Sequence, residues 1–177
     1  MMKEYLLENG TAADLHQLRS SRLPLEQYQP AHQSLVQACH DVVIEYQGGA
    51  LLVKRTNFPA KDHLYVPGGR IERGMPAEES LRMRVKAECN LDLYDIRPLG
   101  CARTFFRTDP FGHGKGTDTL NLLFFARGKG ELRLDDLHEK PTLIHPTDYT
   151  TAFRSTLDEY VRDLLDMTMP IVVSLAF

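Results

Sequence analysis

The sequence predicts an α/β or α+β fold, a sandwich in which helices cover a mixed β-sheet. The order of the elements predicts this, because a hairpin, a helix, further strands and a last helix follow one another along the chain. The composition agrees, since 42% hydrophobic and 25% charged residues are typical of a globular chain, and 177 residues suffice for one domain with a substantial core. We expect residues 1–34 to form an N-terminal extension, and residues 35–177 to form the domain, C-terminal helix and tail included.

The N-terminal extension carries one short helical pattern. Residues 11–22, TAADLHQLRSSR, place Leu15 and Leu18 on one side of a helix that Thr11 can cap. The proline-containing segment that follows is predicted to be a polar connector.

A β-hairpin is the clearest local prediction. Residues 39–55, CHDVVIEYQGGALLVKR, contain two apolar strands joined by a Gly-Gly turn. The loop 56–63 and the short segment LYVPGGR, residues 64–70, then lead towards a helix.

The predicted helix covers residues 76–89, PAEESLRMRVKAEC. Pro76 suits its first turn, Glu78 and Glu79 suit the positive end of its dipole, and Asn90 suits a left-handed stop. Apolar residues four apart predict its buried stripe: Leu81, Val85 and Cys89.

Two more strands and a helix are predicted in the C-terminal half. The strands cover residues 96–107 and 119–127, and the glycine-rich loop 108–118 separates them. The helix spans about residues 150–167, and its apolar face consists of Phe153, Leu157, Val161, Leu164 and Leu165. The apolar tail, MPIVVSLAF, is expected either to join a dimer contact or to cap the sheet.

Charge and cysteine content exclude several classes. The net charge of −3 and the scattered Lys and Arg residues give no electrostatic reason to expect a nucleic-acid partner. Three cysteines without paired spacing indicate neither a disulfide framework nor a zinc site, which favours a reducing cytoplasm. The start MMKEYLLENG does not read as a secretion signal, and the run IVVSLAF is too short to span a bilayer, so no membrane association is expected.

The glycine-rich loop resembles a nucleotide-binding P-loop only in its composition. The segment GHGKGT resembles a P-loop in composition, but glycine follows its lysine and a strand follows the segment. A P-loop needs Ser or Thr directly after the lysine and a helix next. The loop is better interpreted as a strand connector or a cover over a substrate.

The turn Gly68-Gly69-Arg70 is a candidate anion site. Glycine permits close approach of the backbone, and an arginine fork can bind a phosphate. Arg55, at the end of the preceding strand, is a second cation of this kind. The alternative is a plain turn with solvated arginines.

Glu88 is a candidate metal ligand. It lies in the last turn of its helix, where the dipole disfavours a carboxylate by about 0.3–1 kcal/mol, so a nearby cation is expected. Arg84, four residues earlier, could supply that cation as an ordinary exposed ion pair. A magnesium ion is the functional alternative, since Mg²⁺ accepts one or two carboxylates together with phosphates and water.

His138, within DDLHEK, is a candidate general base. Its acidic neighbours suit a histidine that works near neutral pH. An exposed loop histidine without a role is the alternative.

Taken together, KRTNFPAKDHLYVPGGRIERG and the acidic start of the next helix resemble the Nudix hydrolases, most closely the branch of GDP-mannose mannosyl hydrolases. That branch has the run KRTN-x-PA followed by VPGGR, and a helix whose acids are reduced to one metal-binding glutamate. The resemblance covers about residues 35–148 and implies a Nudix-type α/β/α sandwich with a mixed sheet.

The general Nudix signature, GX5EX7REUXEEXGU with U aliphatic, is matched poorly. When it starts at Gly69, three expected acids become Met75, Arg84 and Ala87, and Glu88 alone remains. This is the reduced pattern of the mannosyl hydrolases.

The resemblance implies a role for each matched residue. Glu88 and the carbonyl of Gly69 would bind Mg²⁺, and Arg55 and Arg70 would contact the diphosphate. Arg70 would also stabilise the charge that develops during catalysis. Asp41 matches an aspartate that faces the sugar.

The general base of the branch is a histidine directly preceded by a metal-binding glutamine. With a one-residue insertion, His138 matches the base and Leu137 the glutamine. Without the insertion, Glu139 matches the base and His138 the glutamine. The sequence leaves both alignments open.

The resemblance thus implies a magnesium-dependent hydrolase of a nucleoside-diphosphate sugar, in which water attacks the anomeric carbon, and it also implies a homodimer. Thr104 stands where the branch has a sugar-contacting histidine, and Leu122 or Leu123 where it has an aromatic residue. These departures keep two alternatives open: attack at phosphorus on another nucleoside diphosphate derivative, and a domain that binds a nucleotide sugar without cleaving it.

Overall fold

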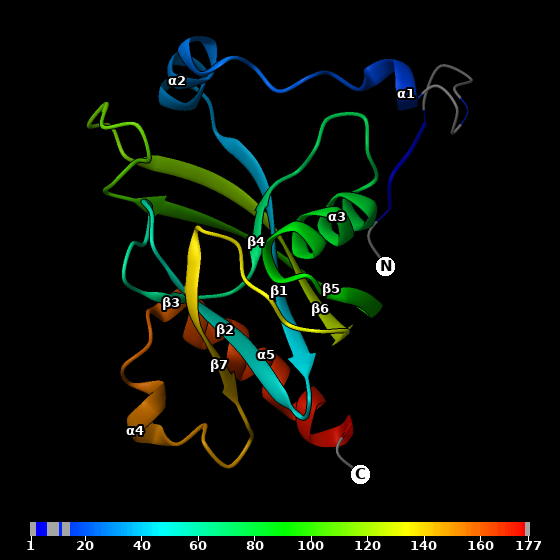
Figure 1. Ribbon diagram of the computed structural model, residues 1–177, viewed down its shortest axis with the longest axis vertical. Coiled ribbons are helices and arrows are strands. Elements are labelled where there is room, and N and C mark those ends of the chain that lie inside the picture. Colours follow the sequence, from blue (N-terminus) through cyan, green and yellow to red (C-terminus); the bar gives the residue numbers. More distant parts are fainter. Residues whose placement is uncertain (1–2, 7–10, 12–14, 176–177) are drawn as a thin grey trace.

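The computed structural model describes residues 3–6, 11 and 15–175. Within these residues, seven strands form one mixed sheet (Figure 1). The strands are β1 (Gln37–Tyr46), β2 (Gly49–Arg55), β3 (Leu64–Tyr65), β4 (Gly68–Arg70), β5 (Asp92–Phe106), β6 (Thr117–Lys129) and β7 (His138–Ile144). The helices are α1 (Leu15–Leu18), α2 (Leu25–Ser34), α3 (Ala77–Cys89), α4 (Thr151–Arg154) and α5 (Glu159–Leu175).

The long strand β1 organises the sheet. The strand order is β3-β2-β1-β6-β5, with β7 beside β2, and β1 runs parallel to β6. Two antiparallel partners share the other edge of β1. Residues 39–41 pair with β4, and residues 44–46 pair with β2. The divergence of β2 from β4 leaves room for loops and side chains beside the first half of β1.

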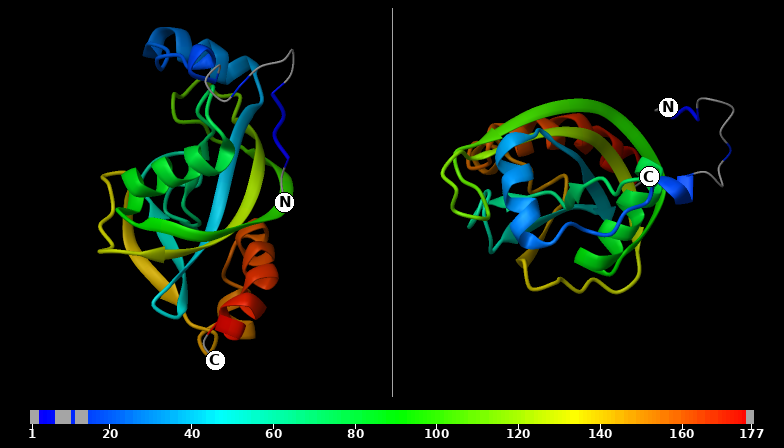
Figure 2. Two further views of the ribbon diagram at one scale, coloured as in Figure 1. Left: turned by 90° about the vertical axis from the view of Figure 1, so that its right-hand side faces the viewer. Right: turned by 90° about the horizontal axis from the view of Figure 1, so that it is seen from above.

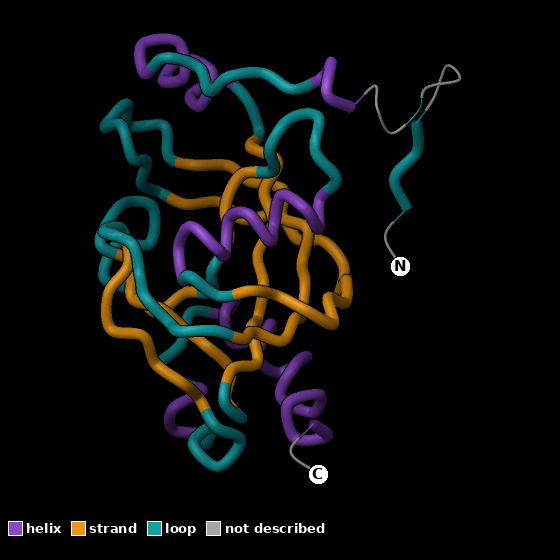
Figure 3. The backbone as a smooth tube through the Cα atoms, turned by 45° about the vertical axis from the view of Figure 1, so that its right-hand side comes forward, coloured by secondary structure: helices purple, strands orange, loops and turns teal. Residues whose placement is uncertain are grey.

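One helix covers each face of the sheet, so the fold is the predicted α/β/α sandwich (Figure 3). Successive residues of β1 point to opposite faces. Val42 and Ile44 pack with α3, whereas Val43 packs with α5. On α3, Leu81 and Val85 are fully buried, and each burial contributes about 1.5–3 kcal/mol.

The hairpin and helix α3 are confirmed, with one change of detail. Gln47 and Gly48, rather than Gly48 and Gly49, form the turn between β1 and β2, and both have positive φ. Asn90 ends α3 in the left-handed conformation, with φ 57°, as expected.

The prediction for the N-terminal extension is wrong in two respects. The expected helix 11–22 is observed only as α1, which buries no residue and starts beyond Thr11, while residues 12–14 lie outside the described part. The expected connector instead forms α2, which begins after Pro24 and contains Pro30. Proline fits the first turn of a helix, but a proline further along, such as Pro30, normally argues against one. This is why a connector was expected here.

The C-terminal prediction is partly wrong. The expected helix 150–167 is divided into α4 and α5, and α5 continues to Leu175 through Pro170. Met169 and Val172 of the tail are buried in the core beneath the sheet. The tail therefore caps the sheet. None of the helices in the described residues is long and apolar enough to cross a membrane.

Candidate active site

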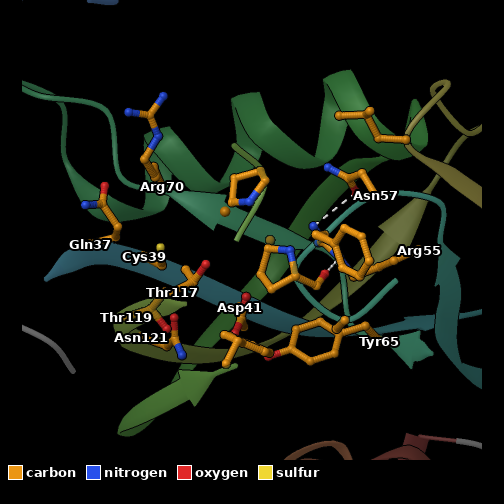
Figure 4. Close-up of a pocket in the computed structure, with 18 of the residues that line it drawn as sticks. Gln37, Cys39, Asp41, Arg55, Asn57, Tyr65, Arg70, Thr117, Thr119 and Asn121 are labelled. Atoms are coloured by element: carbon orange, nitrogen blue, oxygen red, sulfur yellow. Dashed lines mark hydrogen bonds between the residues drawn. The ribbon is translucent and has the colours of Figure 1, made fainter. Parts of the chain in front are cut away.

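A cleft of about 370 Å³ lies beside the first half of β1. Side chains from α2, β1, α3, β6 and the loop after β2 line it, so segments far apart in the sequence meet there. Figure 4 shows Asp41 of β1, Asn57 of the loop and Asn121 of β6 around it. Six of the residues predicted for the site line this cleft: Asp41, Arg55, Gly69, Arg70, Glu88 and His138. Glu139 does not line it.

Four arginines of the described residues line the cleft, and two of them, Arg22 and Arg84, pair with glutamates, which leaves Arg55 and Arg70. The Nε of Arg55 donates to the Pro59 carbonyl at 2.7 Å, and its Nη2 donates to Oδ1 of Asn57 at 3.2 Å. The Arg70 guanidinium lies over the Tyr28 ring, 4.0 Å from its centroid. Within the described residues, no carboxylate forms an ion pair with either arginine. Their charges therefore remain available to an anion.

The glycine pair lets β4 pack closely on β1. A Cβ on Gly68 would lie 2.3 Å from both Oδ1 of Asp41 and the His40 carbonyl oxygen. Gly69 has φ +152°, which side-chain-bearing residues rarely adopt, and a Cβ there would lie 3.3 Å from Nε of Arg84. The turn thus brings its backbone against both Asp41 and α3.

Glu88 and Arg84 form a buried pair, not the exposed pair expected from the sequence. Glu88 is only 6% exposed, and its Oε2 accepts a hydrogen bond from the Gly68 backbone N–H at 3.3 Å. Nε of Arg84 lies 3.9 Å from Oε1 of Glu88, too far for a hydrogen bond, and has no hydrogen-bond partner. Burial raises the pKa of Glu88 to about 8, although Arg84 and the Gly68 N–H oppose this shift. Burial therefore disfavours the charged form of Glu88, which a further cation at the carboxylate would favour.

This donor set fits one magnesium ion but not a multi-metal site. No cluster of three or more His, Cys, Asp or Glu side chains suited to a metal occurs in the described part of the chain. Mg²⁺ needs only one or two carboxylates when phosphates and water complete its shell. Glu88 lines the cleft next to the Gly68-Gly69 turn, and burial leaves its charged form in need of a cation.

A polar group lies at the floor of the cleft, around Asp41. The Tyr160 hydroxyl donates to Oδ2 of Asp41 at 2.6 Å. Burial raises the pKa of Asp41 to about 6, although the Tyr160 hydroxyl and the positive charge of Arg55 oppose this shift. On β6, Thr119 lies 2.5 Å from the Thr104 hydroxyl, which also accepts a hydrogen bond from Asn121 at 3.1 Å.

His138 and Glu139 point in different directions at the start of β7. Nδ1 of His138 lies 2.7 Å from Oδ1 of Asp135, and its side chain is buried at the cleft. Glu139 instead forms an ion pair with Lys54 at 3.2 Å and is 44% exposed. Leu137 also lines the cleft. Of the two candidate bases, only His138 can meet a ligand there.

The sequence reading missed several residues of the cleft. Tyr28 and His32 of α2 line it, because α2 packs on the loop between β5 and β6 (Figure 2). Their spacing of four places them on one helix face and was a usable signal. Asn121 also lines it and stands out as a polar residue in an apolar strand. No local signal marked Tyr160, which lies outside the lining but donates to Asp41.

Comparisons with known proteins identify the domain family. The family model described as NUDIX domain matches residues 37–164. A curated relative, the low-salt glycan biosynthesis protein Agl8 of Haloferax volcanii, is 27% identical over 117 residues, which are 66% of this chain and 71% of Agl8.

Solved structures share the fold at low identity. A MutT NUDIX hydrolase from Burkholderia pseudomallei matches with TM-score 0.60 and 20% identity over 76% of this chain and 98% of its own. The NUDIX domain of Shewanella oneidensis NrtR, solved with ADP ribose, matches with TM-score 0.61 and 14% identity, over 85% of this chain and 99% of its own.

Proposed function

Because the chain belongs to the Nudix hydrolase family, we propose that it is a magnesium-dependent hydrolase of a nucleoside-diphosphate sugar resembling GDP-mannose. Water would attack the anomeric carbon and release the sugar and the nucleoside diphosphate.

The observation that carries this proposal is the composition of the cleft. It combines two arginines without acid partners, one buried carboxylate on α3, and a histidine held by an aspartate. Attack at phosphorus in this family relies on several acids to hold metal ions and activate water there. Attack at carbon requires fewer, because a side chain can activate the water and the diphosphate leaves as one unit.

Each side chain has one task in this reaction. Arg55 and Arg70 bind the diphosphate and stabilise the charge that it gains when the bond from the anomeric carbon to oxygen breaks. His138 takes the proton from the attacking water, and Asp135 orients the histidine through Nδ1. Asp41 faces the sugar. Glu88 and the Gly69 carbonyl would hold Mg²⁺, which supplies further positive charge to the departing diphosphate.

One relative supports a sugar-containing substrate, because Agl8 is named for glycan biosynthesis.

The test is hydrolysis in ¹⁸O-labelled water over a panel of GDP-, ADP- and UDP-sugars, with products identified by mass spectrometry. Label in the released sugar supports attack at carbon. Label in phosphate would show attack at phosphorus, the second enzymatic candidate, and would overturn the proposal.

A binding domain without hydrolytic activity is the candidate from another class. Leu137 beside His138, where the resembled branch has glutamine, and Arg84 next to Glu88 both favour it. In that case a GDP-sugar binds tightly and stays intact for hours with Mg²⁺.

We further propose that the protein is cytoplasmic, that it forms a homodimer, and that residues 1–34 are an extension to the domain. Cell fractionation and light scattering test the first two.

A further inference from the structure

We propose that α2 is part of the substrate site, and that Tyr28 is a positioning residue that holds the Arg70 guanidinium ready for a diphosphate. This inference rests on the proposed function for the identity of the ligand. It goes beyond that function by giving a role to a helix that lies before the matched family domain, which starts at residue 37.

The contact between Tyr28 and Arg70 orients the cation without neutralising it. The guanidinium lies 4.0 Å from the ring centroid, within the range of a cation–π interaction. A carboxylate partner would consume N–H donors and cancel the charge. An aromatic face does neither, so the fork of Arg70 keeps its donors for phosphate oxygens.

Tyr28 is itself held in place by the loop 107–116. The Phe111 ring meets the Tyr28 ring edge-on, with centroids 5.3 Å apart, and meets the His32 ring in the same way at 5.1 Å. Gln29 donates to the Phe111 carbonyl at 3.4 Å. The position of Tyr28 is therefore set by tertiary packing as well as by its own helix.

The loop is ordered from within by Asp109. Its carboxylate accepts backbone N–H bonds from Phe111, His113 and Gly114, at 2.8, 3.1 and 3.0 Å. This loop joins β5 to β6, and residues of both strands line the cleft. Helix α2 is therefore anchored to the site through the loop as well as through the contact between Tyr28 and Arg70.

A histidine pair completes the attachment and adds a polar group to the cleft. Nδ1 of His32 lies 2.9 Å from Nε2 of His113. Nδ1 of His113 accepts a hydrogen bond from the Lys115 backbone N–H, so in the neutral pair Nε2 of His113 carries the proton and donates it. His32 then carries its own proton on Nε2, and this residue lines the cleft.

Binding of methylenediphosphonate, a non-hydrolysable diphosphate without base or sugar, tests the inference by calorimetry on the full chain. Tyr28→Leu should weaken binding about tenfold, which lies within the range of a partly desolvated cation–π contact. Tyr28→Phe keeps the ring and should restore nearly all of the affinity. In an Arg70→Ala background, Tyr28→Leu should change the affinity by less than about twofold, because the two residues act as one unit.

The matched control is Tyr94→Leu. Tyr94 lies under Arg127, 5.1 Å from the guanidinium, and neither residue lines the cleft. Its removal should leave binding unchanged, and circular dichroism should show that all variants are folded.

The outcomes separate the two proposals. If Arg70→Ala weakens binding and Tyr28→Leu does not, the positioning role alone is wrong. If Arg70→Ala has no effect, the diphosphate site is wrong, and the positioning role falls with it. An equal loss from Tyr28→Leu with and without Arg70 also overturns the positioning role.

Discussion

The two walls of the cleft differ in how the chain builds them. One wall, which we call the signature wall, consists of Gly68–Arg70, α3 and the start of β7, and its parts are tied together by the Asp135 N–H bond to the Glu88 carbonyl. The other, the assembled wall, combines α2 and the loop 107–116, and we include with it Tyr160 of α5, which does not line the cleft but donates a hydrogen bond to Asp41. Their chemistry differs as well. The signature wall, together with Asp41 of β1 and Arg55 of β2, carries the charged groups, whereas the assembled wall carries mainly aromatic rings and neutral donors.

This difference suggests a division of labour. Charged groups near a diphosphate stabilise the charge that develops in the transition state, and their positions decide which bond breaks. The signature wall is therefore expected to set the reaction. Rings discriminate between substrates by shape. Neutral hydrogen-bonding groups reject a substrate that would leave them buried without a partner, so the assembled wall is expected to set specificity. Variants of the two walls test this division of labour.

Loss of the His138 imidazole should have the largest effect. We expect His138→Gln to lower kcat by about 10²–10⁴-fold, the usual contribution of a general base. Glu139→Gln should lower kcat less than about twofold, because this side chain pairs with Lys54 outside the cleft. Steady-state kinetics on the best nucleotide sugar makes the comparison. A large loss of kcat in Glu139→Gln and a small one in His138→Gln would instead identify Glu139 as the general base.

Loss of the Glu88 carboxylate should follow. Glu88→Gln should lower kcat/KM with Mg²⁺ by about 100-fold or more, since a bound cation stabilises transition-state charge by several kcal/mol. Glu78→Gln is the matched control, because Glu78 lies exposed on the same helix. Equal activity of the two variants would remove the metal role from Glu88.

Arg84 should oppose metal binding. Its Nε lies 3.9 Å from the Glu88 carboxylate, so a cation at that carboxylate meets a like charge. We expect Arg84→Gln to tighten Mn²⁺ binding about tenfold, equivalent to about 1.4 kcal/mol, as measured by electron paramagnetic resonance. Arg84→Lys, which keeps a charge, should remain near the wild type. Weaker Mn²⁺ binding in the glutamine variant would mean that Arg84 supports the site instead.

The two walls also differ in how far they could be predicted. Gly68, Gly69 and Arg70 are consecutive, and Glu88 follows on a helix whose caps and stripe are local signals, so sequence patterns located most of the signature wall. That Glu88 is buried, and that His138 rather than Glu139 turns inward, depends on strand geometry that the sequence left open.

The assembled wall depends on packing between distant segments. Pro30 argued against α2 by local rules, and the helix is observed packed on Phe111, more than 70 residues later. Tyr160 reaches Asp41 across 119 residues. Such pairings are tertiary, and no window of sequence contains both partners.

The smallest effect is expected from the hydroxyl of Tyr160, and it should depend on pH. Burial raises the pKa of Asp41 from 3.8 to about 6, and the hydroxyl opposes that rise. Because the folded pKa is above the unfolded one, the stabilising contribution of Asp41 is complete below about pH 4 and is lost as the pH rises through about 6. Tyr160→Phe removes a donor to the ionised carboxylate, so the pKa of Asp41 should rise further and the loss should extend to higher pH.

The free energy of unfolding of Tyr160→Phe should thus fall below that of the wild type by about 1 kcal/mol at pH 8, with the gap opening above pH 6, as urea denaturation would measure. Tyr149→Phe is a matched control, since Tyr149 donates the same kind of bond to Asp166, whose pKa is held at about 2 by Arg154 and Tyr149. Its effect on stability should show no change near pH 6. An Asp41→Asn background should abolish the pH dependence of the Tyr160 effect. A gap that persists there would mean that the Tyr160 hydroxyl acts through a group other than Asp41, such as the Asn121 side chain, because the phenylalanine keeps the ring that stacks on Tyr65.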